Sequence, residues 1–331
     1  MSTNGPSLEI LDLRHFTAAM LRALLETEAG LWHDRLHWDY RNSIKLLNQY
    51  LDNRMLPGYA ATLAEQVVGY VFCVYEESKA VIGDVFSADS LHGARATAGC
   101  ALALERRLLA HMLELVTNSP QIERIESQML VHPSGALTPI FREAGFEIFR
   151  RLFLVQPLAG RWSTPRLRIP DQLELRPWRD EDLTGAARLI CEAYRCHPDS
   201  LINDQYRTVQ GSMRFLNNIV RYSGCGVFAP TASHVIVHRT HRELAGLVLG
   251  SRVSPVSGHI TQICIHPEYR RRGMARGLLE LAAFHFMRMG VGEVSLTVTE
   301  ENAPAVELYL EQGYSSVHSF DAAVWQRSRL A

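Results

Sequence analysis

Hydrophobic and polar positions follow the same series of patterns twice along the chain. A short strand pattern, polar residues and an amphipathic helix occur in LEILDLRHFTAAMLRALLE from Leu8 and again in LELRPWRDEDLTGAARLICEAY from Leu173. Two strand patterns joined by a polar hairpin follow in each half, in QVVGYVFCVYEESKAVIGDVF and in LAGLVLGSRVSPVSGHITQICI. Each half then has a strand, a turn and a short helix that ends in a glycine, Gly145 or Gly313. The pattern therefore predicts two copies of one α+β fold.

The order of the predicted elements indicates how each copy folds. Several strands precede a long helix, and a strand, a helix and a last strand follow it. That order is typical of a mixed, mostly antiparallel sheet with helices on both faces. Between the copies, AGRWSTPRLRIPD is rich in proline, arginine and small residues and has no apolar periodicity. We therefore expect a first domain at residues 1–160, a linker at 161–171 and a second domain at 172–331.

Composition and charge give no support to several classes of function. Of the 331 residues, 47% are hydrophobic and 21% are charged, and the net charge is −1. This balance provides no electrostatic reason to expect nucleic acid or a membrane surface as a partner. The six cysteines form no CxxC pair, and no histidine cluster has a carboxylate or cysteine at ligand spacing. The cysteine and histidine spacing therefore predicts no metal site. Because neither a signal-peptide pattern nor an apolar run of roughly 18 residues occurs, we expect a cytoplasmic protein.

Three consecutive arginines, Arg270 to Arg272, stand beside Gly273 where a helix is predicted to begin. Adjacent like charges repel one another and usually belong to a solvated surface. The start of a helix, however, exposes free backbone N–H groups and the positive end of the helix dipole. Gly273 and Ala275 would let the backbone approach a phosphate, and the arginines would neutralise its outer charge. The loop predicts a site for a polyanion, with a solvated helix cap as the alternative.

A second motif follows in LTVTEENAPAVELYLEQGY, which contains a strand, Asn302 as a helix N-cap and Gly313 as the C-cap. Together the two motifs resemble the GNAT family of N-acetyltransferases. The family's acetyl-CoA signature, Q/R-x-x-G-x-G/A, is matched by RRRGMA at residues 270–275. Its second signature, an Asn before a helix that carries a Tyr and ends in a glycine–aromatic pair, is matched by Asn302, Tyr309, Gly313 and Tyr314. The matched motifs cover roughly residues 246–318.

The resemblance implies a role for each matched position. Backbone N–H groups from Arg271 to Ala275 would hold the pyrophosphate of acetyl-CoA, the expected co-substrate. Backbone groups of the preceding strand would pair with the pantetheine arm, and Asn302 would contact that arm. The expected cofactor-binding residues are Ile263, Cys264, Ile265, Arg270, Arg271, Arg272, Gly273, Met274, Ala275 and Asn302.

Tyr309 would lie near the thioester sulfur and is the first catalytic candidate. A thiol has a pKa of about 8.5 and a phenol one of about 10, so a phenolic O–H can protonate the leaving thiolate or donate a hydrogen bond to it. The alternative for Tyr309 is an aromatic side chain that packs on the helix face it shares with Val306 and Leu310.

The first copy departs from the family pattern. Phe141 stands at the position of Tyr309, Ser134 stands at that of Asn302, and no arginine–glycine loop precedes the long helix. This copy resembles a degenerate GNAT domain that has lost acetyl-CoA.

An amine acceptor must lose a proton, because an alkyl ammonium group has a pKa of about 10.4. Many GNAT enzymes place a glutamate on the central strand, but GHITQICI has none, and His259 at its start is the candidate base. A solvated histidine at a strand end is the alternative. The resemblance places the acceptor pocket on the first helices of the domain, where the candidate substrate-binding residues are His197, Asp199, Asn203 and Tyr206. Helix capping is the alternative for Asp199.

These observations favour an acyl-CoA-dependent N-acyltransferase that moves acetyl to an amine of a small molecule or peptide. We expect direct attack in a ternary complex, since Cys264, the thiol nearest the site, lies in an apolar strand that suits packing. A non-catalytic CoA-sensing module is the alternative. Polyamine, amino acid, antibiotic, peptide N-terminus and protein lysine remain open as acceptors, and either a monomer or a homodimer is compatible with the sequence.

Overall fold

The computed structural model describes residues 7–88, 99–159, 165, 167–222 and 226–328. The chain divides into two compact units. The N-terminal unit comprises the residues up to Leu36, Tyr40–Arg150 and the residues from Ser319 onward. The C-terminal unit comprises His37–Asp39 and Arg151–His318.

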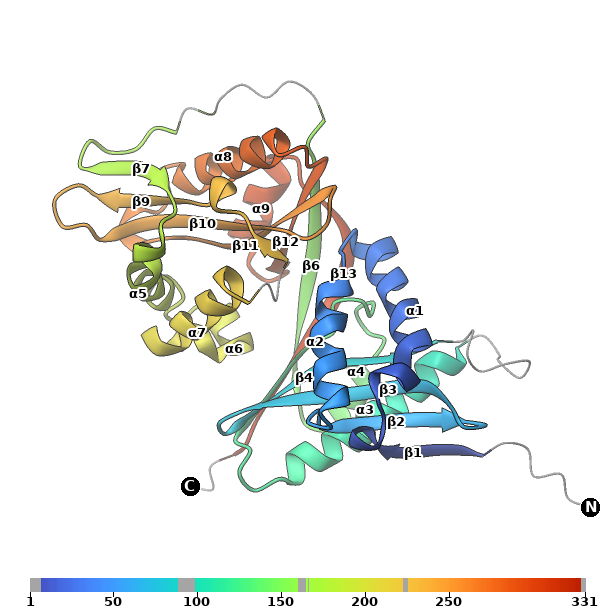
Figure 1. Ribbon diagram of the computed structural model, residues 1–331. Coiled ribbons are helices and arrows are strands. Elements are labelled where there is room, and N and C mark those ends of the chain that lie inside the picture. Colours follow the sequence, from blue (N-terminus) through green and yellow to red (C-terminus); the bar gives the residue numbers. More distant parts are fainter. Residues whose placement is uncertain (1–6, 89–98, 160–164, 166, 223–225, 329–331) are drawn as a thin grey trace, which may run out of the picture. The chain divides into compact units, whose positions relative to one another are not determined.

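The N-terminal unit is a mixed sheet with helices on both faces (Figure 1). Its strands follow the order β1 (Leu8–Asp12), β2 (Gly58–Leu63), β3 (Gln66–Glu76), β4 (Lys79–Ser87), β5 (Arg124–Gln128) and the end of β13 (Ser315–Gln326). Every neighbouring pair is antiparallel except β4 and β5. One apolar cluster packs α1 (Ala18–Leu36) and α2 (Arg41–Asp52) on one face, and a second packs α3 (Cys100–Asn118) and α4 (Thr138–Glu143) on the other.

The C-terminal unit repeats this arrangement. Its strands follow the order β7 (Leu173–Pro177), β9 (His234–His238), β10 (Leu244–Arg252), β11 (Ser257–Ile265), β12 (Glu293–Thr299) and the part of β6 (Glu147–Pro157) from Arg151, while β8 (Val227–Phe228) pairs with β10. Only β11 and β12 run parallel. In Figure 1, α5 (Leu183–Ala193), α6 (Asp199–Ile202) and α7 (Val209–Val220) lie on one face, and α8 (Met274–Arg288) and α9 (Ala303–Glu311) lie on the other. The predicted fold class, two copies of a mixed and mostly antiparallel sheet with flanking helices, is confirmed.

Short 3-10 helices connect several of these elements: η1 (Leu13–His15), η4 (Asp180–Asp182), η5 (Asp204–Arg207), η6 (Pro230–Ala232) and η7 (Pro267–Tyr269).

The units do not follow the domain boundaries expected at residues 160 and 172. The β6 residues 151–157 pair with β12 of the C-terminal unit, and Ala322–Gln326 of β13 pair with β5 of the N-terminal unit. The last strand of each repeat thus provides the partner for a strand of the other repeat, because backbone hydrogen bonding rather than sequence order decides which sheet a strand completes. The expected linker lies partly outside the described residues, and Leu167 within it packs against Gly277 of α8.

A buried pair of carboxyl groups lies in the N-terminal unit. Glu28 of α1 is 0% exposed and shares a hydrogen bond with Asp84 of β4. The Tyr70 hydroxyl also donates to Glu28 Oε2 at 2.6 Å. Burial, assisted by the nearby Asp84 charge, raises the pKa of Glu28 well above its ordinary value. Glu28 therefore keeps its proton in the native state at pH values where an exposed glutamate is ionised.

Replacing Glu28 with glutamine should weaken the pH dependence of stability. An unfolded glutamate titrates near pH 4.3, so the stabilisation from the raised native pKa is complete below that pH and is lost as the pH rises through the native value. Between the unfolded and the native pKa of Glu28, we expect the free energy of unfolding of the wild type to fall by up to about 1.4 kcal/mol per pH unit. The free energy of unfolding of the Glu28→Gln variant should change less over the same pH range. Urea unfolding from pH 5 to pH 9 measures both, and parallel curves would contradict the expectation.

Candidate active site

The parallel strands β11 and β12 separate part-way along their length. Their paired residues run from Ser257 opposite Glu293 to Ile260 opposite Leu296, but both strands continue, to Ile265 and Thr299. Beyond that point no β11–β12 ladder is formed, so the facing edges can offer backbone N–H and C=O groups to a ligand.

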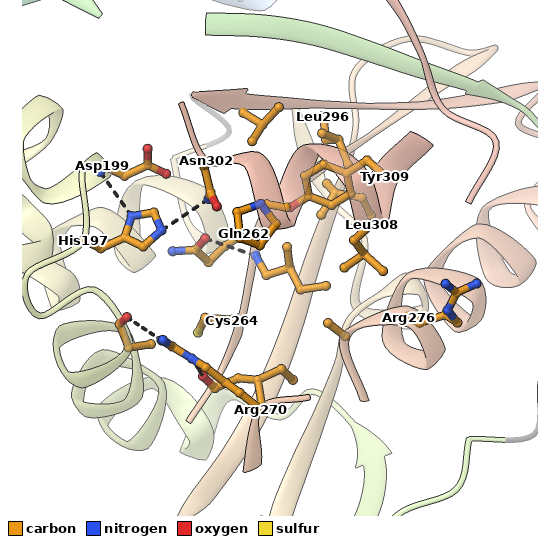
Figure 2. A pocket seen from close by; sticks show the side chains of 18 of the residues that line it. His197, Asp199, Gln262, Cys264, Arg270, Arg276, Leu296, Asn302, Leu308 and Tyr309 are labelled. Atoms are coloured by element: carbon orange, nitrogen blue, oxygen red, sulfur yellow. Dashed lines mark hydrogen bonds between the residues drawn. The ribbon is translucent and has the colours of Figure 1, made fainter. Parts of the chain in front are cut away.

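A pocket of about 720 Å³ opens at this split. It is lined by the separated parts of β11 and β12, by the loop and first turn of α8, by α9, and by residues that follow α5 (Figure 2). Of the residues expected from the sequence, those that line it are Ile263, Cys264, Ile265, Arg270, Arg271, Gly273, Met274, Ala275, Asn302, Tyr309, His197, Asp199 and Tyr206. The structure therefore brings together most of the predicted cofactor and acceptor residues in one cavity.

The loop before α8 leaves the start of this helix uncapped. Gly273 is the N-cap residue, has a φ of 76° and provides no side-chain hydrogen bond to the first turn. Arg271 also has a positive φ, of 63°, which is unfavourable for a residue with a side chain. The N–H groups of the first turn consequently remain available, and the helix dipole favours an anion there.

The three arginines of this loop have different contacts. The Arg270 guanidinium donates to the carbonyl oxygens of Ala193 at 2.7 Å and Ile265 at 3.2 Å, so it links the end of α5 to the end of β11. Arg272 lies outside the pocket lining, over the ring of Tyr269 and with one bond to the Glu268 carbonyl oxygen. Arg271 lines the pocket and is the arginine best placed to neutralise a bound anion.

Asn302 and His197 form a small hydrogen-bonded network at the pocket wall (Figure 2). The backbone N–H of Asp199 donates to His197 Nδ1 at 3.1 Å. Burial lowers the pKa of His197, so the ring is neutral at physiological pH and its single proton lies on Nε2. Asn302 Nδ2 is 3.2 Å from that nitrogen. Because Nε2–H is also a donor, the pair forms a hydrogen bond only when the amide is turned by 180° so that its oxygen accepts, and the turned amide leaves its NH₂ group for a ligand.

Tyr309 enters the pocket from α9 and is 7% exposed. Its ring packs against Tyr314 with centroids 5.9 Å apart. Burial, with a smaller contribution from the Asp199 charge, raises the pKa of Tyr309 above its ordinary value. The phenol is therefore protonated at physiological pH and can donate its proton or a hydrogen bond.

His259 does not lie where a general base is needed. It is outside the pocket lining and 5% exposed, and its ring packs between Trp38 and Phe153 with centroid distances of 5.0 and 6.0 Å. Its Nδ1 pairs with the Ser295 hydroxyl at 2.9 Å, and burial lowers the pKa of His259 to about 3. This packing explains the histidine structurally and does not support the expected role as a base.

Two further expectations concern residues that the structure assigns to packing or to turns. Asn203 does not line the pocket, and its Oδ1 accepts from the Gln205 N–H as the cap of η5. Cys264 lines the pocket but is buried, and burial raises the pKa of its thiol to about 12. A thiol that stays protonated is a poor nucleophile, in line with a mechanism without an enzyme-bound acyl group.

Sequence reasoning missed Gln262, Tyr194 and Arg151, which also line the pocket. Gln262 follows a β-bulge in β11 and is 5% exposed. Its Oε1 accepts from the Tyr194 hydroxyl and from the Ile263 N–H, both at 3.0 Å, while its Nε2 has no partner in the described part of the chain. The matching position after the bulge in β4 is Asp84, so a repeat-to-repeat comparison could have found this site.

Comparison with known proteins decides the family of this part of the chain. The model of the acetyltransferase (GNAT) family matches residues 200–314. These residues form a GNAT domain. The family resemblance predicted from the two sequence motifs is thereby confirmed, and the GNAT domain contains the split strands, the α8 loop and Tyr309.

Solved structures share the fold over nearly the whole chain. A GCN5-related N-acetyltransferase from Sphaerobacter thermophilus has a TM-score of 0.67 at 14% identity and covers 96% of this chain and 95% of its own. A tandem GNAT protein from the clavulanic acid biosynthesis pathway has a TM-score of 0.58 at 16% identity and covers 98% of this chain and 100% of its own. At these identities the likeness concerns the fold.

Curated relatives match part of the chain. The mycothiol acetyltransferase of Geodermatophilus obscurus is 26% identical over 189 residues, which are 56% of this chain and 58% of that protein. The mycothiol acetyltransferase of Nocardioides sp. is 28% identical over an alignment of 200 residues, which covers 56% of this chain and 63% of that protein. The matched part therefore spans less than two thirds of the length of each relative.

The described residues offer no candidate for a metal site or a membrane span. In that part of the chain no group of three or more His, Cys, Asp or Glu side chains is arranged to hold a metal ion. No helix there has both the length and the apolar character that a membrane crossing requires.

Proposed function

We propose that the C-terminal unit is an acyl-CoA-dependent N-acyltransferase that moves acetyl from acetyl-CoA to an amine. The observation that carries the proposal is one pocket that combines the split of β11 from β12, the uncapped start of α8 and the protonated Tyr309. An elongated ligand with a phosphate at one end and an amide-containing arm matches those features in that order. The two mycothiol acetyltransferases support acetyl transfer, but their partial coverage does not identify the acceptor.

The residues of the pocket suggest how binding occurs. The N–H groups at the start of α8 and the Arg271 side chain hold the pyrophosphate, and the free edge of β11 pairs with the pantetheine amides. His197 Nε2 contacts the Asn302 amide, and with the amide oxygen turned toward His197 the NH₂ group of Asn302 binds the same arm. In the ligand-free arrangement Gln262 Oε1 takes the Ile263 N–H, so we expect the Gln262 side chain to release this group when the arm binds.

Direct attack then requires three proton transfers: the acceptor ammonium loses one proton, its nitrogen loses a second as the amide forms, and the departing thiolate gains one. The second proton returns through water to Tyr309 after that residue has protonated the thiolate. The neutral amine forms the new C–N bond as the C–S bond breaks, and Tyr309 donates its proton or a hydrogen bond to the departing thiolate. The ammonium form of the acceptor must first lose a proton. The carboxylate of Asp199, which lines the pocket and accepts a hydrogen bond from Thr299, is placed to take it directly or through water.

We propose that the N-terminal unit does not bind acetyl-CoA. At the start of its α4, the Asp321 carboxylate accepts from the Ser134 hydroxyl at 2.5 Å and from the Gly135 N–H at 2.8 Å. A negative charge thus occupies the helix start that corresponds to Asn302 in the other repeat. Phe141, at the position of Tyr309, is 1% exposed and packs in the core.

Release of CoA thiol tests the proposed function. The full chain should release thiol from acetyl-CoA in the presence of a mixture of amines, and initial rates at varied concentrations of both substrates should give intersecting reciprocal plots. Intersecting plots indicate a ternary complex. Binding of acetyl-CoA without turnover of any amine would instead favour the CoA-sensing alternative, and parallel plots would contradict direct attack.

A further inference from the structure

Two opposite charges line the acceptor side of the pocket without pairing with each other. Asp199 of α6 accepts a hydrogen bond from the Thr299 hydroxyl. Arg151 of β6 is the strand partner of Thr299, and its Nη2 reaches the Thr297 hydroxyl at 3.4 Å. Among the described residues no ion pair joins Asp199 to Arg151, although both are associated with the same end of β12.

Arg151 has unused capacity for hydrogen bonding. Among the described residues its buried Nε has no hydrogen-bond partner, and the hydrogen bond of its Nη2 is a long one to the neutral Thr297 hydroxyl. A guanidinium group in a partly buried site normally binds a carboxylate or a phosphate, because leaving the charge unpaired there is unfavourable. The buried amide NH₂ of Gln262, also without a partner, faces the same pocket and provides a second donor.

Each of the other charged side chains that line the pocket has a partner, a place in the loop before α8 or exposure to solvent. Arg276 pairs with Glu311, and the guanidinium of Arg270 binds two backbone carbonyl groups. Arg271 belongs to the loop before α8, and Glu307 is exposed on α9. Asp199 and Arg151 are therefore the charges left to meet an acceptor.

We propose that the acceptor is an amine that also carries a carboxylate or another small oxyanion, with its ammonium group at Asp199 and its oxyanion at Arg151. This inference rests on the proposed acyltransferase function. Thr299 donates its hydroxyl to Asp199 and is the strand partner of Arg151, so both charges lie beside the same end of β12. A compact ligand that carries both opposite charges, such as an amino acid, fits this arrangement. A polyamine would instead bring a second positive charge to Arg151.

The reaction on such an acceptor is balanced by the groups already placed. The ammonium group loses a proton to Asp199 or to water, the free amine forms a C–N bond to the acetyl carbon, and the C–S bond breaks. The thiolate receives its proton from Tyr309, while the oxyanion stays bound to Arg151 and holds the nucleophile in position. The nitrogen loses its second proton as the amide forms, and this proton restores Tyr309 through water. The products are an N-acetyl acid, free CoA and the one proton that the ammonium group lost.

Matched acceptors test the inference on the full-length wild-type protein. The probes are the proteinogenic L-amino acids, their carboxamides, the amines that lack the carboxyl group, and aminoalkylphosphonates. Thiol release from acetyl-CoA gives kcat and KM for each. We expect an amino acid or an aminoalkylphosphonate to be the best acceptor, with kcat/KM at least about 30-fold above that of its neutral counterpart. Comparing the amino acids with the aminoalkylphosphonates shows whether the preferred oxyanion is a carboxylate or a phosphonate.

Variants separate recognition from folding. Arg151→Met should raise KM for the oxyanion acceptor about 30-fold or more and leave kcat/KM for the neutral counterpart within about threefold. Arg150→Met removes the neighbouring exposed arginine, which lies in the other unit, and should change neither value. Arg151→Lys should recover part of the affinity.

Two results would overturn the inference while the proposed function stands. One is equal or better turnover of carboxamides, simple amines or polyamines, which requires no variant. The other is an equal loss for all acceptors in Arg151→Met. Binding of acetyl-CoA without turnover of any probe would reject the proposed function and this inference together.

Discussion

Replacing Tyr309 with phenylalanine should lower kcat by about 100- to 1,000-fold and leave the affinity for acetyl-CoA within about threefold. The phenol is buried in the pocket, and its raised pKa keeps it protonated, so the substitution removes the proton donor for the leaving thiolate. Steady-state thiol release gives kcat, and calorimetry gives the dissociation constant. The aromatic ring and its contact with Tyr314 remain, which limits the structural effect of the change.

Tyr314 provides a matched control. It is 3% exposed, lies outside the pocket lining, and its hydroxyl has no partner among the described residues. Tyr314→Phe removes one buried hydroxyl from the same aromatic pair and should leave kcat within about threefold. A Tyr309→Phe variant with unchanged kcat would assign Tyr309 to packing, as the alternative derived from the sequence has it.

Replacing Gly273 with glutamate should weaken acetyl-CoA binding by about 100-fold or more. The new carboxylate would stand at the uncapped start of α8, where the phosphates are expected, and like charges at a binding site are strongly unfavourable. A side chain at the Gly273 φ of 76° is also strained, which should lower stability by about 1–2 kcal/mol.

Gly290, beyond the other end of α8, separates these two effects. It has a φ of 79° and, like Gly273, no atom within 4 Å of the position that a Cβ would take, so a glutamate there meets the same backbone strain in open space. Gly290→Glu should lose similar stability and keep wild-type affinity for acetyl-CoA. Equal loss of binding in both variants would mean that destabilisation, not the phosphate site, explains the result for Gly273.

The parts of the site that the sequence predicted are those formed by short contiguous segments. The loop at residues 270–275 and the helix that carries Tyr309 need only a few neighbouring residues, and small residues, caps and charges in order are enough to specify them. The repeat of the whole pattern likewise predicted two similar sheets, because hydrophobic periodicity depends on local secondary structure.

The parts that escaped prediction depend on long-range strand pairing. Arg151 reaches the pocket because β6, at the end of the first repeat, pairs with β12 of the second, a choice that no local pattern encodes. A β-bulge between Ile260 and Gln262 places Gln262 toward Tyr194, whereas His259 is covered by Trp38 from a distant loop. One inserted residue in a strand reverses the faces on which the later side chains lie. The sequence therefore does not reveal that Gln262, and not His259, reaches the pocket.

Calorimetric titration of acetyl-CoA into the wild-type chain is the decisive measurement for the acyl-CoA site, because it counts the sites. We predict one site per chain, lost in Gly273→Glu and retained in Gly290→Glu. Two sites would show that the N-terminal unit also binds acetyl-CoA despite Asp321 and Phe141. No binding would mean that the arginines at 270–272 belong to a solvated helix cap, and it would contradict the acyltransferase assignment.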